Sequence, residues 1–423
     1  MNALIHSLRY GRVAKLWATT ASILVRVLGP KFAALLSYLG MNWGPSRPGP
    51  TVLCLSRESF IKDIVELRSR GQFNYPMVMG GFTRFQMAWF PAEMQTQTFY
   101  QAYRGAGKED AVRKSTAYAH QLIKLASRTR KIDAVLSANF DYWQDVGFKQ
   151  ACRDLNIPFF VLSREHPIVP KVCDVVVDWY QRAAYTFDGA VIAVAGKSTR
   201  DVLARVGSVC RPEQVVITGL PRFDAWLDVD KNLPLEHRPW ITLLTFTDGY
   251  YADQTFREVL NGFCRSARKH AGSSIRFLIK TKDIDDTFAV RRLISEEDAI
   301  HVVCTHDVDL FRVLPESRLV INYNSLSLVE AAMARTPIVI PAWGECKDRG
   351  SEVMYSIENP KVAKLVIFAG SKEAMLESIA ESVAGKRGLL EKEAARAFVD
   401  EYIHIPAFGS CSKDFEDLLH KYL

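Results

Sequence analysis

The chain of 423 residues is longer than one ordinary hydrophobic core organises, and it is long enough for two domains. Its 48% apolar and 24% charged residues are typical of a soluble globular protein, and no low-complexity or collagen-like segment appears. The net charge of +7 suits an anionic ligand or an anionic membrane surface. Because no zinc-finger, homeodomain or RNA-recognition signature appears, we expect no nucleic-acid partner.

Eight cysteines are scattered along the chain, and none forms a CxxC pair. Most lie in apolar runs, where cysteine behaves as a small hydrophobic residue. Disulfide frameworks and zinc sites need clustered spacing, so we predict neither, and a reducing, cytoplasmic compartment fits best. No cluster of histidines and carboxylates points to a divalent ion, so we expect no metal and no cofactor.

The N-terminal segment, residues 1–50, is basic and apolar. Between residues 4 and 39 there is no acidic residue, and apolar clusters alternate with Arg9, Arg12, Lys15, Arg26 and Lys31. The apolar runs are shorter than the roughly 20 residues of a spanning helix. Two interpretations stay open: a basic amphipathic helix in peripheral contact with the inner face of the cytoplasmic membrane, or a helical hairpin packed on the first domain. Residues 40–50 are predicted to be a linker.

Residues 51–232 alternate between strand and helix patterns, which is typical of a parallel sheet covered on both faces. Strands are expected at residues 51–55, 77–79, 134–137, 158–162, 189–193 and 215–218. Helices are expected at residues 60–70, 111–130, 143–155 and 198–206, with Ser198 as a candidate cap of the last one.

Residues 233–390 repeat the same alternation after a linker at residues 233–239. Strands are expected at residues 240–246, 275–280, 300–304, 319–322, 337–341 and 364–368, and helices at residues 254–270 and 326–334. Open α/β sheets bind ligands beyond the carboxyl ends of their strands. We therefore predict an α/β protein of two Rossmann-like domains that face each other across a cleft.

The clearest functional signal is the stretch at residues 322–341, NYNSLSLVEAAMARTPIVIP. Ser325 and Ser327, with Asn324 and Leu326 in the same turn, precede a helix that follows a strand. Unpaired backbone N–H groups and the helix dipole suit a phosphate there. Glu330, about one turn later, is placed to accept hydrogen bonds from ribose hydroxyls. The plainer alternative is an ordinary capped helix with a solvated Glu330.

This stretch resembles the donor-binding motif of GT-B glycosyltransferases. Retaining members carry an acidic residue eight positions before the helical glutamate, where this chain has Asn322. The turn is more similar to that of sialyltransferases, Kdo transferases and teichoic-acid glycerophosphotransferases. The resemblance implies a nucleotide-sugar donor as substrate, CMP- or CDP-linked, and a bacterial surface polysaccharide or lipid-linked glycan as acceptor. It also implies that residues 391–423 form helices that pack back on the N-terminal domain.

Residues 218–224, TGLPRFD, carry a second resemblance. Similar TG-x-PR-x-D segments close the first domain of teichoic-acid polymerase-like enzymes, where the segment faces the cleft. Arg222 is then placed to contact a phosphate or carboxylate of the donor with its planar fork. The structural alternative is that Asp224 pairs with Arg222 and holds the linker.

Two segments that follow strands of the first domain offer catalytic candidates. In SREHP, Glu165 and His166 combine an acid with a histidine, which suits general acid–base catalysis. In SANFDYWQD, Asp141 directly follows the strand end and is placed to deprotonate an acceptor hydroxyl or to attack an anomeric carbon. Asp145 starts the next helix. Each carboxylate has the alternative role of a turn or capping residue.

The second domain offers further donor contacts. Lys280 and Lys282 end a strand beside the proposed donor site, where their charge would offset the leaving phosphate in place of a metal. Thr247 and Asp248 belong to the first turn of this half, where backbone can approach a phosphate. His306 is expected to flank a base pocket.

These features favour a metal-independent glycosyltransferase that uses a CMP-Kdo-like donor in lipopolysaccharide or capsule synthesis. Three alternatives stay open. A non-hydrolysing UDP-sugar 2-epimerase has the same fold and needs no acceptor, a polyol-phosphate transferase would use CDP-glycerol, and a GT-B scaffold would have no catalytic activity.

Overall fold

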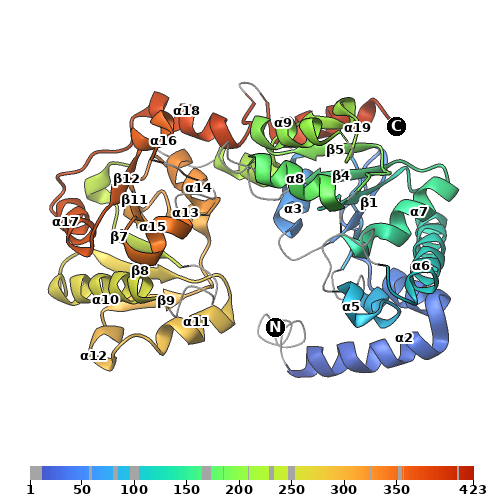
Figure 1. Ribbon diagram of the computed structural model, residues 1–423, viewed down its shortest axis with the longest axis horizontal. Helices are drawn as coiled ribbons and strands as arrows, with labels where there is room; N and C mark the ends of the chain where they lie inside the picture. The colour runs from blue at the N-terminus through green and yellow to red at the C-terminus, as the bar shows by residue number, and fades with distance from the viewer. Residues whose placement is uncertain are drawn as a thin grey trace. The chain divides into compact units, whose positions relative to one another are not determined.

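The computed structural model describes residues 12–56, 60–79, 84–95, 104–140, 142–163, 173–183, 185–207, 209–227, 233–245, 253–323, 325–350, 355, 357–406 and 409–423. The chain divides into two compact units, each with its own sheet (Figure 1). The first unit holds the described residues within Met1–Glu165, Val175–Asp224 and Pro406–Leu423. The second holds those within His166–Asp174 and Ala225–Ile405.

The first unit is built on a six-stranded parallel sheet in the order β2-β1-β3-β4-β5-β6. Its strands are β1 (Val52–Leu55), β2 (Met77–Val78), β3 (Ala134–Ser137), β4 (Phe159–Ser163), β5 (Val191–Val194) and β6 (Val215–Ile217). The chain moves to one side from β1 to β2 and then crosses to the other side with β3. The direction of winding therefore reverses between β1 and β3, and such a reversal is where open α/β sheets bind ligands.

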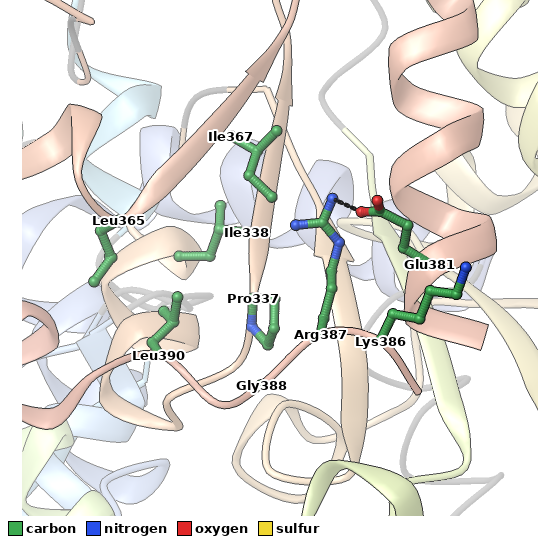
Figure 2. Close-up of a pocket in the computed structure, with 9 residues that line it drawn as sticks. All are labelled: Pro337, Ile338, Leu365, Ile367, Glu381, Lys386, Arg387, Gly388 and Leu390. Carbon is green, nitrogen blue, oxygen red and sulfur yellow. Dashed lines mark hydrogen bonds and ion pairs between the residues drawn. The ribbon is translucent and has the colours of Figure 1, made fainter. Parts of the chain in front are cut away.

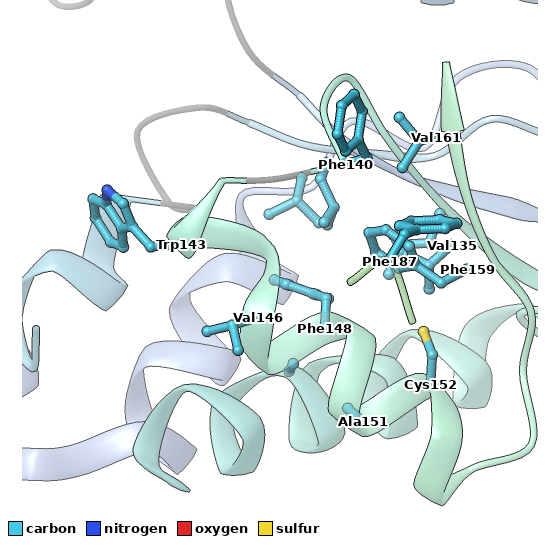
Figure 3. Close-up of a cluster of buried hydrophobic side chains, with 14 of the residues drawn as sticks. Val135, Phe140, Trp143, Val146, Phe148, Ala151, Cys152, Phe159, Val161 and Phe187 are labelled. Atoms are coloured by element: carbon cyan, nitrogen blue, oxygen red, sulfur yellow. The ribbon is translucent and has the colours of Figure 1, made fainter. Parts of the chain in front are cut away.

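Helices and short 3-10 turns precede, connect or follow these strands. They are α2 (Arg12–Leu39), α3 (Ile61–Arg70), η2 (Arg84–Ala88), α5 (Ala92–Gln95), α6 (Lys108–Thr129), η4 (Trp143–Asp145), α7 (Val146–Asp154), α8 (Cys173–Ala183), α9 (Lys197–Val206), η6 (Pro212–Gln214), η7 (Pro221–Leu227) and, from the end of the chain, α19 (Cys411–His420). Figure 3 shows the resulting core, in which Val135, Phe159 and Val161 of the sheet lie in one cluster with Phe148 and Cys152 of α7. Both faces of the strands are buried, so they are apolar without interruption.

The second unit also has a six-stranded parallel sheet, in the order β12-β11-β10-β7-β8-β9. Its strands are β7 (Trp240–Leu244), β8 (Arg276–Lys280), β9 (Val302–Thr305), β10 (Ser317–Ile321), β11 (Ile338–Pro341) and β12 (Val366–Ala369). Counted from the first strand of this unit, the order is 3-2-1-4-5-6, that of dinucleotide-binding sheets. The reversal lies between β7 and β10, which pair directly.

The helices of the second unit follow its strands in turn. They are η8 (Leu235–His237), α10 (Gln254–Lys269), α11 (Ile284–Arg291), α12 (Glu296–Ala299), α13 (Leu310–Val313), α14 (Ser327–Met333), α15 (Gly344–Gly350), α16 (Pro360–Ala363), α17 (Lys372–Val383) and α18 (Lys392–Tyr402). Two parallel sheets confirm the predicted α/β class, and each of the twelve predicted strands is present with its ends shifted by no more than about two residues.

Two local predictions are wrong. Ser198 is not the cap of α9, because that helix begins at Lys197 after an extended Gly196. Residues 40–50 are not a free linker, because Asn42 forms an antiparallel bridge with Met77, with N–O distances of 3.0 and 2.8 Å. This bridge extends the edge of the first sheet beyond β2.

The N-terminal helix α2 packs on the first unit with one face. It is kinked at Gly29, whose φ of 78° is followed by Pro30. The hydroxyls of Ser37 and Tyr118 lie 2.9 Å apart between α2 and α6. The segment therefore packs on the first unit from Val25 onward, although it forms one kinked helix and not the expected helical hairpin. Among the described helices, none combines the length and the apolar character that crossing a bilayer requires.

The C-terminal helix α19 is held in the first unit by two buried carboxylates. Asp224 accepts hydrogen bonds from the N–H groups of Cys411 and Ser412, at 2.7 and 2.8 Å. Glu416 accepts from the N–H groups of Gln72 and Phe73 and from the Tyr75 hydroxyl, at 2.7 to 3.0 Å. The alternative that Asp224 pairs with Arg222 is wrong, because both carboxylate oxygens face the start of α19. The preceding helix, α18, packs instead on α14 in the second unit.

Asp224→Ala should lower the free energy of unfolding by about 2 kcal/mol, because it removes a cap and leaves two buried N–H groups without an acceptor. Urea titration of the full chain measures this loss. Asp417→Ala is the matched control, since Asp417 lies on α19 and its ion pair with Lys413 is exposed. Its expected effect is below about 0.5 kcal/mol. Equal losses in the two variants would contradict the anchoring role of Asp224.

Candidate functional site

The turn that follows β10 lies at the winding reversal of the second sheet. Asn322 comes directly after the strand, and Ser325 and Ser327 lead into α14. The neighbouring strand at the reversal, β7, ends at Leu244 on the same edge. Topology thus brings the polar turn singled out in the sequence to the edge where sheets of this order bind ligands.

The turn is shaped by its own hydrogen bonds. The Ser325 hydroxyl accepts from the N–H of Ser327 and donates to the Ser327 hydroxyl, both at 3.2 Å. The Tyr355 hydroxyl donates to the Ser325 carbonyl at 2.7 Å. Burial raises the pKa of Tyr355, and the nearby negative charge of Glu330 raises it further, so this donor keeps its proton. The two serine side chains are therefore held in place on a rigid turn.

The expectation of unpaired backbone N–H groups at the start of this helix is wrong. The N–H groups of Leu328, Val329 and Glu330 donate to the carbonyls of Ser325 and Leu326, at 3.0 to 3.2 Å, and that of Ser327 is also bound. The helix has only seven residues, so its dipole is small as well. From Ser327 to Glu330, a donor to a phosphate must therefore come from a side chain.

Carboxylates already occupy the starts of the helices that follow the neighbouring strands. Asp283 accepts from an N–H at the start of α11, and Asp309 does so at α13. At α10, Glu345 accepts from the N–H groups of Gln254 and Thr255 and from the Thr255 hydroxyl. The turn before α14 is capped by a neutral hydroxyl instead. Since like charges repel, a phosphate is disfavoured at the capped starts of α10, α11 and α13, whereas at α14 the negative charge is that of Glu330 in the first turn and not of the cap.

A buried amide lies at the same turn. Asn322 is 1% exposed, and its Oδ1 accepts from the N–H of Tyr323 at 2.6 Å. Its Nδ2 has no acceptor among the described residues. A buried donor without a partner costs about 1–3 kcal/mol, which makes it unusual in a folded protein. In the sequence, Asn322 is notable only because it stands where retaining GT-B enzymes carry an acidic residue. The structure adds its buried amide as a donor at the turn that contains the two serines.

The charged candidates of the second unit lie at the end of β8 and in the first turn of α14. Glu330 is half-buried in the first turn of α14, near Tyr355. Lys280 ends β8, on the side of β7 opposite β10, and its Nζ donates to the Thr281 carbonyl at 2.6 Å. Two strand spacings amount to about 10 Å, so a nucleotide sugar is long enough to contact both. Lys282 is exposed beyond the strand end.

Several predicted site residues lie outside the described residues. They are Asp141, Glu165 and His166 in the first half and Thr247, Asp248 and Asn324 in the second. Their roles stay predictions. His306 is described, and its Nδ1 lies 3.3 Å from the Thr287 hydroxyl.

The winding reversal of the first sheet carries two polar residues that sequence reasoning missed. Ser56 follows β1, Asn139 follows β3, and both are at most 5% exposed. The Ser56 hydroxyl and the Asn139 Oδ1 have no hydrogen-bond partner among the described residues. One residue further on, the Phe140 carbonyl accepts from the buried ammonium of Lys149. Their position directly after a strand was visible in the sequence, but their burial was not.

Two candidates of the first unit have structural partners. Asp145 is not a helix cap, because its carboxylate accepts from the Ser137 hydroxyl at 2.6 Å and makes no capping bond to α7. The N–H of Arg222 donates to Asp63 at 3.1 Å, which brings the segment after β6 to the first turn of α3. The Arg222 Nε has no acceptor among the described residues. Arg222 therefore lies at the carboxyl edge of the first sheet, and its guanidinium Nε–H is unpaired among the described residues.

A hollow is present at the opposite edge of the second sheet (Figure 2). It lies at the amino ends of β11 and β12, beside the Arg387–Glu381 ion pair at 2.6 Å. Ligands of open α/β sheets bind at the carboxyl edge, so we do not assign it to the site. Within the described part of the chain, no group of three or more histidine, cysteine or acidic residues could hold a metal ion.

Comparisons with known proteins identify the fold. No family model matches the chain, and no curated protein matches its sequence. UDP-GlcNAc 2-epimerase from Neisseria meningitidis, solved with UDP-GlcNAc, superposes with a TM-score of 0.50 at 12% identity, over 88% of this chain and 100% of that one. The S. aureus MnaA–UDP structure gives 0.50 at 11% identity, over 88% and 96%. UDP-N-acetylglucosamine 2-epimerase from Rickettsia bellii gives 0.50 at 11% identity, over 89% and 97%. The chain therefore has the GT-B-like fold of these proteins.

Glu345→Gln should change how stability depends on pH. The Thr255 hydroxyl and backbone N–H groups lower the pKa of Glu345 from 4.5 to about 2. A carboxylate with a lowered pKa stabilises the fold above its unfolded pKa, and this contribution is lost as the pH falls toward 2. Wild type should therefore exceed the variant in urea midpoint at about pH 7, and the gap should shrink at about pH 3.

Glu377→Gln is the control for this measurement, because Glu377 is an exposed residue of α17. It should leave the midpoint close to that of wild type at both pH values. A gap between wild type and Glu345→Gln that does not narrow in acid would show that Glu345 does not act through its charge.

Proposed function

We propose that this chain is an enzyme that acts on a nucleotide-activated sugar, bound at the carboxyl edge of the second sheet. The proposal rests on one observation: a hydrogen-bonded turn with two serines follows β10 where a sheet of dinucleotide-binding order reverses. The hydroxyl of Ser327 and the amide of Asn322 would donate to a phosphate oxygen. Glu330 would accept from ribose hydroxyls, and Lys280 would offset phosphate charge. Arg222, Asp141, Glu165 and His166 stay our candidates for contacts to the sugar and for proton transfer.

Epimerisation at C2 of a UDP-sugar is the reaction that we place first. Two of the structures above are UDP-GlcNAc 2-epimerases, and the third was solved with UDP. This preference replaces the expectation of a CMP-Kdo-like donor. Glycosyl transfer from a CMP- or CDP-linked donor to a glycan or lipid-linked acceptor is the second candidate. The TGLPRFD segment and Asn322 support it, since both resemble the transferase pattern.

Ser327→Ala and Glu330→Ala should each weaken nucleotide binding by about tenfold, because each removes a hydrogen bond in which one partner is charged. Isothermal titration of UDP and CMP into the full chain measures both affinities. Ser371→Ala and Glu377→Ala are the matched controls on α17, where Ser371 caps the helix after the edge strand β12. They should leave nucleotide affinity unchanged. Binding that none of the four variants alters would contradict the site, and no binding of any nucleotide would favour the scaffold alternative.

Incubation with UDP-GlcNAc alone in heavy water should distinguish the two reactions. Inversion at C2 breaks the C2–H bond and returns a proton from solvent, so an epimerase yields a second sugar nucleotide with deuterium at C2. Proton NMR detects both changes. Unaltered UDP-GlcNAc, together with transfer from a CMP-linked sugar once a glycan acceptor is added, would reject epimerisation in favour of transfer.

A further inference from the structure

The N-terminal helix α2 exposes an apolar face. Figure 1 shows this helix along an edge of the first unit, beside α6. Large apolar side chains that are at least 41% exposed follow one another along it: Ile23, Leu24, Val27, Leu28, Leu35 and Leu39. We call these six residues the α2 apolar face. Val27 is 78% exposed and Leu39 is 71% exposed, values that are unusual for residues of this type in a folded protein.

The spacing of these residues places them in two groups, one on each side of the kink at Gly29. Val27 follows Ile23 by four positions and Leu24 by three, and Leu28 follows Leu24 by four, so these four residues lie on one side of the helix before its kink. Leu35 and Leu39 are four positions apart after the kink. The exposed Lys31 lies four positions from both Val27 and Leu35.

The opposite face fixes the helix to the domain. Val25 and Ala34 are fully buried in the core of the first unit. The Arg26 guanidinium donates to the Ala88 carbonyl at 2.9 Å, and the Tyr38 hydroxyl lies 2.7 Å from that of Thr129. The apolar face is therefore presented by an anchored helix, and packing on the described residues leaves it uncovered.

The sequence that contains this helix carries charge of one sign. The first acidic residue of the chain is Glu58, and the preceding residues contain seven arginines and lysines: Arg9, Arg12, Lys15, Arg26, Lys31, Arg47 and Arg57. Folding does not require such a stretch to be free of acid. An apolar stripe with basic residues and no acid matches a surface that is apolar below and anionic above.

We propose that the α2 apolar face lies on an anionic lipid bilayer, with its side chains in the boundary between headgroups and acyl chains and with Lys31 against the headgroups. A second copy of the chain is the competing occupant. A symmetric dimer through this face would bring two acid-free basic stretches together, so charge opposes it. A bilayer of anionic lipid supplies the opposite charge and buries the same apolar area. The proposal is independent of the reaction that the chain catalyses.

Co-sedimentation of the full chain with vesicles tests this surface. Wild type should bind vesicles of phosphatidylglycerol and phosphatidylethanolamine, and it should bind neutral phosphatidylcholine vesicles at least tenfold more weakly. The double variant Val27→Ser/Leu39→Ser should lose roughly tenfold or more in binding, because the apolar contact is removed. Lys31→Glu should weaken binding to anionic vesicles and leave the weak binding to neutral vesicles unchanged.

Ile300→Ser is the matched control, because Ile300 is 80% exposed and belongs to the second unit. It should bind vesicles as wild type does. Unfolding midpoints of all variants, compared in urea, exclude a loss of fold, which the exposure of Val27 and Leu39 makes unexpected. The proposal is overturned if wild type leaves anionic vesicles unbound, or if Val27→Ser/Leu39→Ser binds them equally well. A wild-type dimer that this variant converts to a monomer, without any vesicle binding, would assign the face to a second copy instead.

Discussion

The named strands of both sheets all pair in parallel, and this single constraint determines where a site can form. In a parallel sheet the chain leaves every strand at the same edge, so all strand-to-helix turns meet there. Where the winding reverses, successive turns lead to opposite faces and leave the strand ends between them accessible. In the second unit those ends belong to β7 and β10, and in the first to β1 and β3. Ser56, Asn139 and Asn322, each with a buried polar atom that no described residue satisfies, all lie at these two reversals.

Several acidic side chains have structural roles, because they accept hydrogen bonds from N–H groups of the fold. Asp224 and Glu416 fasten α19 to the first unit, and Glu345 closes the start of α10 in the second. The Glu345 carboxylate occupies N–H and hydroxyl donors at the start of α10 that an anionic ligand would otherwise contact. The serine turn before α14 is different, because its cap is neutral and its hydroxyls remain at the edge of the sheet. Among the helix starts compared at this edge, that of α14 is thus the one whose cap is not a carboxylate.

The fold was largely predictable because buried parallel strands are uninterrupted apolar runs with turn residues on both sides. The twelve strands were predicted in this way, and so was the turn at Ser325–Glu330. Local detail was not. Ser198 has the chemistry of a cap, but the helix begins at Lys197, directly after the extended Gly196. The sequence pattern predicts unpaired N–H groups at the start of α14, but local hydrogen bonds occupy those of Ser327 to Glu330. Among the described residues, the Ser56 hydroxyl and the Asn322 Nδ2 have no hydrogen-bond partner. This depends on burial in the tertiary structure, which no local sequence pattern contains.

The two interpretations of the N-terminal segment turn out not to compete. A helix has two sides, and α2 uses one of them to pack on α6. Packing explains the buried Val25 and Ala34, but it explains neither the exposure of Val27 and Leu39 nor the lack of acid before Glu58. Exposed apolar area is unfavourable in water by about 25 cal/mol per Å², so a fold that retains it on an anchored helix gains nothing in stability. The side of α2 that faces away from the core is therefore best explained by a surface outside the chain. Because α2 belongs to the first unit and the serine turn to the second, vesicle binding and nucleotide affinity can be changed by separate substitutions.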